Sequence, residues 1–324
     1  MKFQQKWSWL GLLICLLCAG SGGCSWLTHI RHTEGPLPPP AFAGPPQLNE
    51  IIAAVNANSD AIHQLQSHGA SLQVDGVPAS LQAQLVVERP RRLRLTARLS
   101  GLTGREVDLG SNDELFWFWL RRNPQPAVFF ARHSQFAQSS IRRRLAIDPI
   151  WLIDSLGLTR MTPEARHSGP FLSGPGRVEV RTVMSQSDGD WTKVMMIDDT
   201  YAWILEQHLY DPTGQLVAST RADRFRFYNE SGVSIPHSVH LQLGPGQPTQ
   251  MSLKLDVSKY VINHLSGDAS QLWAMPQFNG EPKIDITSPA FQPQMLAPVP
   301  SMIPAHEHWN HQISRSRPDQ QNWR

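Results

Sequence analysis

A histidine-rich segment near the C-terminus is the first group of residues whose types could do chemistry. His306, His308 and His311 offer imidazole nitrogens, which are common ligands of zinc. Their spacing is not the His-Glu-x-x-His of a helical zinc site, and the segment follows a proline-rich stretch. The sequence therefore predicts adventitious metal affinity at most. We expect no biological metal site and no other cofactor.

Arrangements that could support nucleophilic or acid–base catalysis form a second group. Ser173 lacks the first glycine of a Gly-x-Ser-x-Gly elbow, and two Gly-Pro-Gly tripeptides are typical of turns and do not continue into a phosphate loop. The acidic pairs Asp188/Asp190 and Asp198/Asp199 stand where turns are expected, and turn chemistry explains them without an acid–base role. We therefore do not expect an enzyme.

The third group is aromatic and could bind an apolar ligand. Glu114–Leu120 reads Glu-Leu-Phe-Trp-Phe-Trp-Leu, so a strand here would bury both of its faces. We expect a helix to cover one face, and a lipid is a candidate for the other. Ordinary core and the lining of a cavity for acyl chains both explain such burial, and the sequence leaves them open. The candidate cavity residues are Leu93, Leu95, Phe116, Trp117, Phe118, Trp119 and Phe129.

The elements that must position these residues are mainly strands. Apolar and polar residues alternate with a period of two from Leu81 to Glu88 and from Arg92 to Leu99, which is typical of half-buried strands. Similar stretches, separated by turn residues, continue to Val257. The pattern predicts a mainly β (α+β) fold with about eleven strands in one antiparallel sheet. A sheet of that size is expected to be strongly curled or closed.

Two helices and two flanks complete the expected organisation. Apolar residues at a spacing of three to four predict a first helix over Gln47–Gln66. A short helix over Ile150–Leu156 should end at Gly157. The ordered domain is therefore expected over 47–264. The many prolines after His264 predict an extended or disordered tail over 265–324.

Charge and cysteine content limit the class of protein. The formal net charge is +2, so there is no bulk electrostatic case for nucleic acid as a partner. Cys15, Cys18 and Cys24 all lie in the first 24 residues, which leaves no thiol for a disulfide in the folded part. The two that are separated by two residues stand inside an apolar run, so we interpret them as part of a signal peptide and not as a redox pair.

The N-terminus has the features of an export signal. Lys2 and Lys6 precede an apolar run of about 13 residues, which is shorter than the ~20 needed for a helix to span a bilayer. Small residues follow at 20–23, directly before Cys24. A proline-rich stretch over 24–46 is expected to act as a stiff tether.

The residues around Cys24 resemble a bacterial lipoprotein box, with Ser21 where the box usually has leucine. The resemblance implies cleavage of a signal peptide over 1–23 and lipidation of Cys24 with a diacylglycerol and an amide-linked acyl chain such as palmitate. Ser25 follows the cysteine, which by the same resemblance implies the outer membrane. Ordinary cleavage and an uncleaved anchor remain as alternatives.

The order of elements resembles the LolA/LolB superfamily of outer-membrane lipoprotein carriers. The resemblance rests on a first helix, a six-stranded meander, a short helix ending in Leu-Gly-Leu158, and about five further strands. Leu109-Gly-Ser-Asn-Asp113, Tyr210-Asp-Pro-Thr-Gly214 and Phe225-Arg-Phe-Tyr228 are similar to stretches of that group. It implies an unclosed half-barrel whose mouth is covered by the first helix and the mid-chain helix.

Two functions follow as hypotheses. The first is a lipid-anchored envelope protein that faces the periplasm and binds an apolar ligand, such as a lipid or an acylated protein, in lipoprotein or lipid trafficking. The second is a non-catalytic envelope scaffold with a filled barrel and a tail that binds an unknown protein partner.

Overall fold

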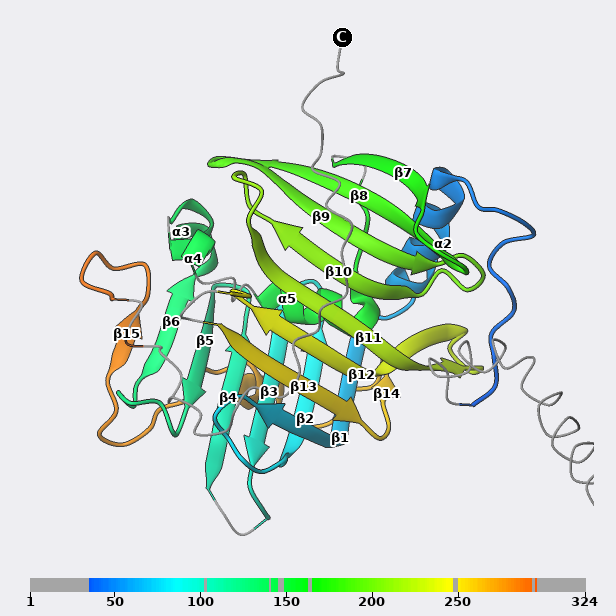
Figure 1. The fold of residues 1–324 in the computed structure, drawn as a ribbon. Helices are drawn as coiled ribbons and strands as arrows, with labels where there is room; N and C mark the ends of the chain where they lie inside the picture. Colours follow the sequence, from blue (N-terminus) through cyan, green and yellow to red (C-terminus); the bar gives the residue numbers. More distant parts are fainter. Residues whose placement is uncertain are drawn as a thin grey trace, which may run out of the picture.

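The computed structural model describes residues 35–101, 104–139, 141–144, 149–162, 165–246, 250–292 and 295. The predicted signal peptide, Cys24 and the segment from His306 to His311 lie outside these residues. Within them, a large curved sheet carries a few short helices (Figure 1). In this part of the chain no helix combines the length and apolar character that crossing a bilayer requires.

The described strands form one sheet of fifteen, in which β14 lies beside β1 and the others follow the order β15-β6-β5-β4-β3-β2-β1-β13-β12-β11-β10-β9-β8-β7. The pairs are antiparallel except for β15 with β6. The order has two different ends, so the sheet is unclosed and the predicted fold class is confirmed. The strands are β1 (Gln64–Val74), β2 (Leu81–Glu88), β3 (Arg92–Arg98), β4 (Arg105–Ser111), β5 (Leu115–Leu120), β6 (Val128–Arg132), β7 (Arg166–Leu172), β8 (Arg177–Gln186), β9 (Gly189–Asp198), β10 (Ile204–Tyr210), β11 (Leu216–Tyr228), β12 (Val233–Leu243), β13 (Met251–Val257), β14 (Val261–Ile262) and β15 (Lys283–Asp285).

The helices are few, and α2 and the α5–η2 segment lie against the inner face of this sheet (Figure 1). The η2 segment continues directly from α5 to Leu158. Gly157, where the sequence predicted the helix to stop, departs from helical geometry inside it with a φ of 81°. The helices are α2 (Leu48–Asp60), α3 (His133–Gln138), α4 (Ile141–Arg144), α5 (Pro149–Ile153), η2 (Asp154–Leu158) and α6 (Ala269–Leu272).

Pairing register defines the inner face of the sheet. Leu85 lies opposite Leu95, Leu95 opposite Leu109, Leu109 opposite Phe118, and Phe118 opposite Phe129. Residues directly opposite each other in antiparallel strands lie on the same face. Five strands therefore present one continuous apolar face, and the main core lies between it and the α5–η2 segment.

Helix α2 starts as predicted and covers the far part of the inner face. The Glu50 side chain accepts a hydrogen bond from the Gln47 N–H at 2.7 Å, which satisfies one of the free N–H groups at the helix start. Ile51 and Val55 pack with Met195 and other inner-face residues of β8 and β9. The covering role predicted for the first helix is thus confirmed.

The end of α2 differs from the prediction. The helix stops at Asp60, and the chain enters β1 at Gln64 where helix was expected up to Gln66. The Asn263 side chain accepts from the His63 and Gln64 N–H groups and donates to the Ala61 carbonyl. A residue about 200 positions away in the chain therefore stabilises the end of the helix, which local spacing does not reveal.

The predicted tail also differs from the structure over its first part. Residues 265–292 form α6 and β15 and pack on the sheet, with Trp273 and Ile286 buried. The segment first crosses the outer face of the sheet, then adds β15 to the edge of β6, and then places Ile284 and Ile286 on the inner face. We call residues 267–292 the C-terminal strap. Its large apolar residues are few and widely spaced, so neither a helical nor a strand period marks it.

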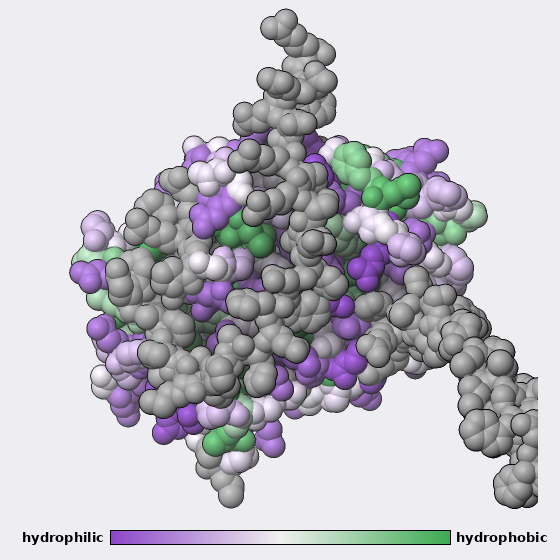
Figure 2. All heavy atoms as spheres, viewed as in Figure 1, coloured by the Kyte–Doolittle hydropathy of each residue, from purple (hydrophilic) through white to green (hydrophobic). Residues whose placement is uncertain are grey.

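The strand count is higher than the eleven predicted because short and irregular strands were missed. Strand β7 contains Gly169 and Pro170, which break the alternation. It forms one free edge of the sheet, and Phe171 and Leu172 are exposed there. Figure 2 shows apolar surface over β7 on a face of otherwise mixed hydropathy.

Candidate apolar binding site on the inner face

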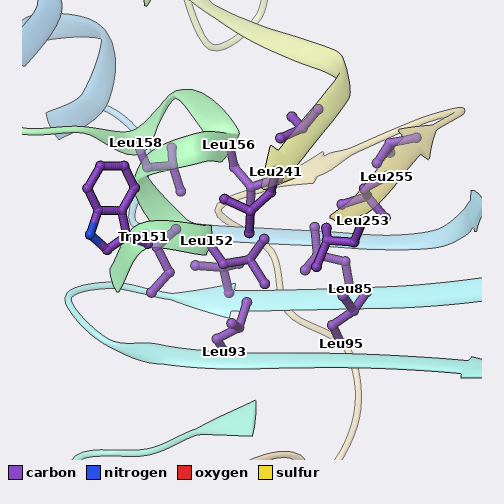
Figure 3. Packing of buried hydrophobic residues seen from close by; sticks show 14 of the residues in the cluster. Leu85, Leu93, Leu95, Trp151, Leu152, Leu156, Leu158, Leu241, Leu253 and Leu255 are labelled. Atoms are coloured by element: carbon purple, nitrogen blue, oxygen red, sulfur yellow. The ribbon is translucent and has the colours of Figure 1, made fainter. Parts of the chain in front are cut away.

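The first part of the candidate site lies beneath the mid-chain helix. Leu93 and Leu95 of β3 are fully buried, and they share one apolar cluster with Leu152 of α5 and Leu156 of η2. Figure 3 shows the leucines of β2, β3, β12 and β13 directed toward the same space as Leu152, Leu156 and Leu158. The curved sheet thus surrounds the mid-chain helix on several sides. Two predicted cavity residues are here, and this helix covers them.

The second part of the candidate site continues along the same face to the edge of the sheet. Phe116, Phe118 and Phe129 form one cluster with Phe136 of α3 and Ile286 of the strap. The rings of Phe118 and Phe129 stack with centroids 5.2 Å apart, and the rings of Phe116 and Phe136 meet edge-on at 5.0 Å. Three more predicted residues are therefore brought together, although the strap and α3 cover them.

The two tryptophans lie on the opposite, outer face. Trp117 and Trp119 form a separate cluster with Val128 and with Phe278 of the strap. The rings of Trp119 and Phe278 stack with centroids 4.0 Å apart. The prediction that all seven residues line one cavity is therefore wrong for Trp117 and Trp119, because alternate residues of a strand point to opposite faces.

The outer-face partner of the aromatic strand is the chain itself, and no lipid is needed there. The strap supplies Phe278 on the outer face and Ile286 on the inner face. The sequence correctly predicts that β5 is covered on both sides. It misses the identity of the cover because the strap is about 160 residues downstream and lacks periodicity.

A buried polar network joins the strap to the outer face. The Asp108 carboxylate is fully buried, lies 2.7 Å from Arg94 Nη2, pairs with Arg105, and accepts a hydrogen bond from Trp117. Arg94 also donates to the Ala274 carbonyl of the strap at 2.6 Å. Burial lowers the pKa of the Arg94 guanidinium, and the Asp108 charge offsets part of that effect. The network therefore combines ionic and backbone contacts to hold the strap.

A second buried polar group lies on the inner face, and the sequence analysis missed it. Lys193 of β9 forms an ion pair with Asp154 of η2. Gln207 of β10 and Thr159 each donate a hydrogen bond to the Asp154 carbonyl, at 3.0 and 3.2 Å. The signal was available, since Lys193 stands on the apolar side of an alternating strand between Trp191 and Met195.

The residues that could do catalysis have structural partners. His133 Nε2 lies 2.9 Å from the Asn112 carbonyl and 3.3 Å from Ser111 Oγ. A carbonyl only accepts, so Nε2 donates to it and does not take a proton from Ser111 in that tautomer. Asp198 Oδ1 accepts from the N–H groups of Thr200 and Tyr201, which is turn chemistry. Among the described residues no group of three or more His, Cys, Asp or Glu side chains could hold a metal ion.

Comparisons with known proteins give matches only among solved structures. No protein-family model matches the chain, and no curated protein matches it. It is similar to a domain described as an outer membrane lipoprotein-sorting protein domain from Vibrio parahaemolyticus, with 10% identity and a TM-score of 0.46 over 69% of this chain and 94% of that one. It is also similar to a LolA superfamily protein from Nitrosomonas europaea, with 12% identity and a TM-score of 0.43 over 69% and 97% of the chains. A DUF1329 family protein from Desulfovibrio piger gives 12% identity and a TM-score of 0.43 over 69% and 98%.

Proposed function

We propose that this protein is a lipid-anchored component of the bacterial cell envelope that binds an apolar ligand on the inner face of its half-barrel. The ligand is an acyl chain, carried by a lipid or by an acylated protein. One observation carries the proposal: the inner face from β2 to β6 is a continuous apolar wall, and the parts that cover it are short segments outside the main strands.

The covers fit a site that opens while the sheet stays intact. The α5–η2 segment has ten residues, from Pro149 to Leu158, and α3 has six. Such short helices contribute little stability of their own, so their positions depend on packing against the wall. An acyl chain that takes their place would bury the same leucine and phenylalanine side chains. Of the seven predicted residues, the ligand would contact Leu93, Leu95, Phe116, Phe118 and Phe129.

Membrane attachment is proposed from the N-terminal sequence. Small residues precede Cys24, and a proline-rich stretch of about 20 residues separates it from α2. Two or three acyl chains on Cys24 would anchor the protein stably, whereas one chain would not. We propose the outer membrane, with the domain facing the periplasm, from Ser25. Replacing Cys24 with Ser should release the full chain from membranes and remove the mass of the acyl chains. Recovery of that variant in the membrane fraction would contradict lipidation.

Ligand binding is tested on the purified full chain by lipid extraction and mass spectrometry, followed by titration with a fluorescent fatty acid. We expect a co-purifying acyl lipid and saturable probe binding. The matched variants are Leu93→Gln, on the inner wall, and Leu99→Gln, at an exposed position just after the same strand. The first should weaken probe binding and the second should not. Absence of both lipid and probe binding would overturn the proposal.

A second function is favoured by the filled state of the second cluster. Phe116, Phe118 and Phe129 are already covered by the strap and α3, as in an ordinary core. A scaffold with a solid barrel would use its C-terminal residues for a protein partner. Because residues 267–292 pack on the sheet, the truncation that separates the two functions should start at 296. If the truncated protein loses a co-purifying protein and still binds the probe, the result supports a partner-binding role for the C-terminal residues.

A further inference from the structure

The inner face of β8, β9 and β10 carries one charged side chain among the described residues. Val180 lies opposite Met195, Thr182 opposite Lys193, and Leu209 also opposite Lys193, so these residues share a face. That face is otherwise apolar or neutral, and it packs against α2 and the mid-chain helix. Lys193 is buried within it.

The partner of Lys193 lies on the cover and not on the sheet. Its ammonium group pairs with the Asp154 carboxylate at the start of η2, and its Nζ lies 5.1 Å from the centre of the Trp151 ring. Both charged side chains are largely withdrawn from water, with exposed fractions of 10% and 15%. The ion pair therefore joins the inner face of β9 to the α5–η2 segment that covers it.

A buried ion pair at this boundary is poorly explained by stability alone. Removing two charges from water costs several kcal/mol per ion, and well-packed apolar residues often serve equally well. If the α5–η2 segment leaves, Lys193 would remain as an isolated cation on the apolar inner face of β9. Burial of that cation beneath a neutral ligand would be unfavourable, whereas an anionic group in the position of the Asp154 carboxylate would restore the pair.

We propose that the apolar ligand carries an anionic head group, which replaces Asp154 as the partner of Lys193. This inference rests on the proposed function and specifies its ligand class: an acyl chain that ends in a carboxylate or a phosphate. A second cation stands beside this position, because the Arg142 guanidinium lies 4.8 Å from the centre of the Trp191 ring, and Trp191 is two residues from Lys193 on the same face.

Three probes of equal chain length test the proposal on the purified full chain: palmitate, hexadecyl phosphate and hexadecanol. Each is measured by displacement of a neutral fluorescent acyl probe. We expect at least one anionic probe to bind about tenfold more tightly than hexadecanol, as expected for one charge-assisted contact. Comparison of the two anionic probes separates a carboxylate from a phosphate source.

Variants assign the preference to Lys193. Lys193→Met should abolish the preference for the anionic probes and keep hexadecanol binding. Because this change leaves Asp154 without its partner, the double variant with Asp154→Asn is measured as well and should behave in the same way. Asp154→Asn alone should strengthen binding of the anionic probes, since the competing carboxylate is gone. Lys254→Met, at a half-exposed lysine on β13, is the matched control and should preserve the preference.

The outcomes separate this inference from the function on which it rests. Equal binding of all three probes, or a preference that survives in both Lys193 variants, overturns the anionic head group and leaves the apolar site in place. Failure of every probe to bind overturns the proposed function itself.

Discussion

The indole N–H of Trp117 donates a hydrogen bond of 3.0 Å to Oδ1 of Asp108, on the neighbouring strand. The ring lies against Gly110, where a Cβ atom would come within 2.0 Å of Trp117 Cζ2. Gly110 is thus required for the close approach of the Trp117 indole to β4, and this contact and the hydrogen bond to Asp108 both hold the ring.

Substitution of Gly110 tests the close contact between the Trp117 ring and β4. Gly110→Ala should lower the free energy of unfolding by about 1–3 kcal/mol, because the indole or the backbone must move to relieve the overlap. Urea denaturation followed by tryptophan fluorescence measures the change. Gly101→Ala is the control, since in the described part of the chain a Cβ atom there would meet no atom within 4 Å beyond its chain neighbours. Equal stability of the two variants would contradict the role of Gly110.

Removal of the Asp108 charge should be more damaging. Asp108→Ala leaves Arg94 buried without its carboxylate, and breaking such a pair typically costs about 3–5 kcal/mol. Asp113→Ala removes an exposed partner of Arg92 and should cost less than about 1 kcal/mol. Both are measured by denaturant unfolding. A small effect at Asp108 would mean that water replaces the carboxylate at Arg94.

The strap gives a prediction about local opening. Ile286 is fully buried on the inner face at the edge of the sheet, so Ile286→Ala should destabilise the protein by about 2–5 kcal/mol and loosen the strap. Limited proteolysis should then cut within 267–292 faster than in the native chain. Leu37→Ala, at an exposed position, should change neither quantity. Unchanged cleavage in the Ile286 variant would show that β15 is held by other contacts.

The sequence predicts the fold wherever neighbouring residues carry the pattern. The alternation over β3 and the two-sided apolar strand β5 specify strands and faces directly. What it does not predict depends on residues far apart in the chain. Asn263 ends the first helix, and Phe278 covers Trp119, through contacts across about 200 and 160 residues. These partners have no period, so only the folded chain identifies them.

The candidate site follows the same division. That Leu93 and Phe118 are buried follows from their strands, but that Trp117 faces the other way from Phe118 requires the pleat to be followed through β5. Lys193 is visible in the sequence as a cation at an apolar position of an alternating strand. The sequence does not identify Asp154 as its partner, because the contact depends on where the α5–η2 segment packs against the sheet.

His240 gives a prediction about pH. Its Nε2 lies 2.8 Å from Ser252 Oγ, and burial lowers its pKa below the ordinary 6.5, although the Asp75 charge acts in the opposite direction. The folded state therefore binds a proton at His240 less readily than the unfolded state. Its contribution to stability is present above the unfolded pKa and is lost as pH falls from 6.5 toward the folded pKa, at up to about 1.4 kcal/mol per pH unit.

The measurement compares the native chain with His240→Gln at about pH 7.5 and about pH 5.5. The native chain should lose more free energy of unfolding between these two pH values than the variant does. An NMR titration should give a pKa for His240 below the ordinary histidine value of 6.5. The range stops at about pH 5.5 because burial raises the pKa of Asp75, and protonation of that carboxyl has the opposite effect on stability. An equal loss in both proteins would mean that His240 is protonated as readily in the folded state as in the unfolded state.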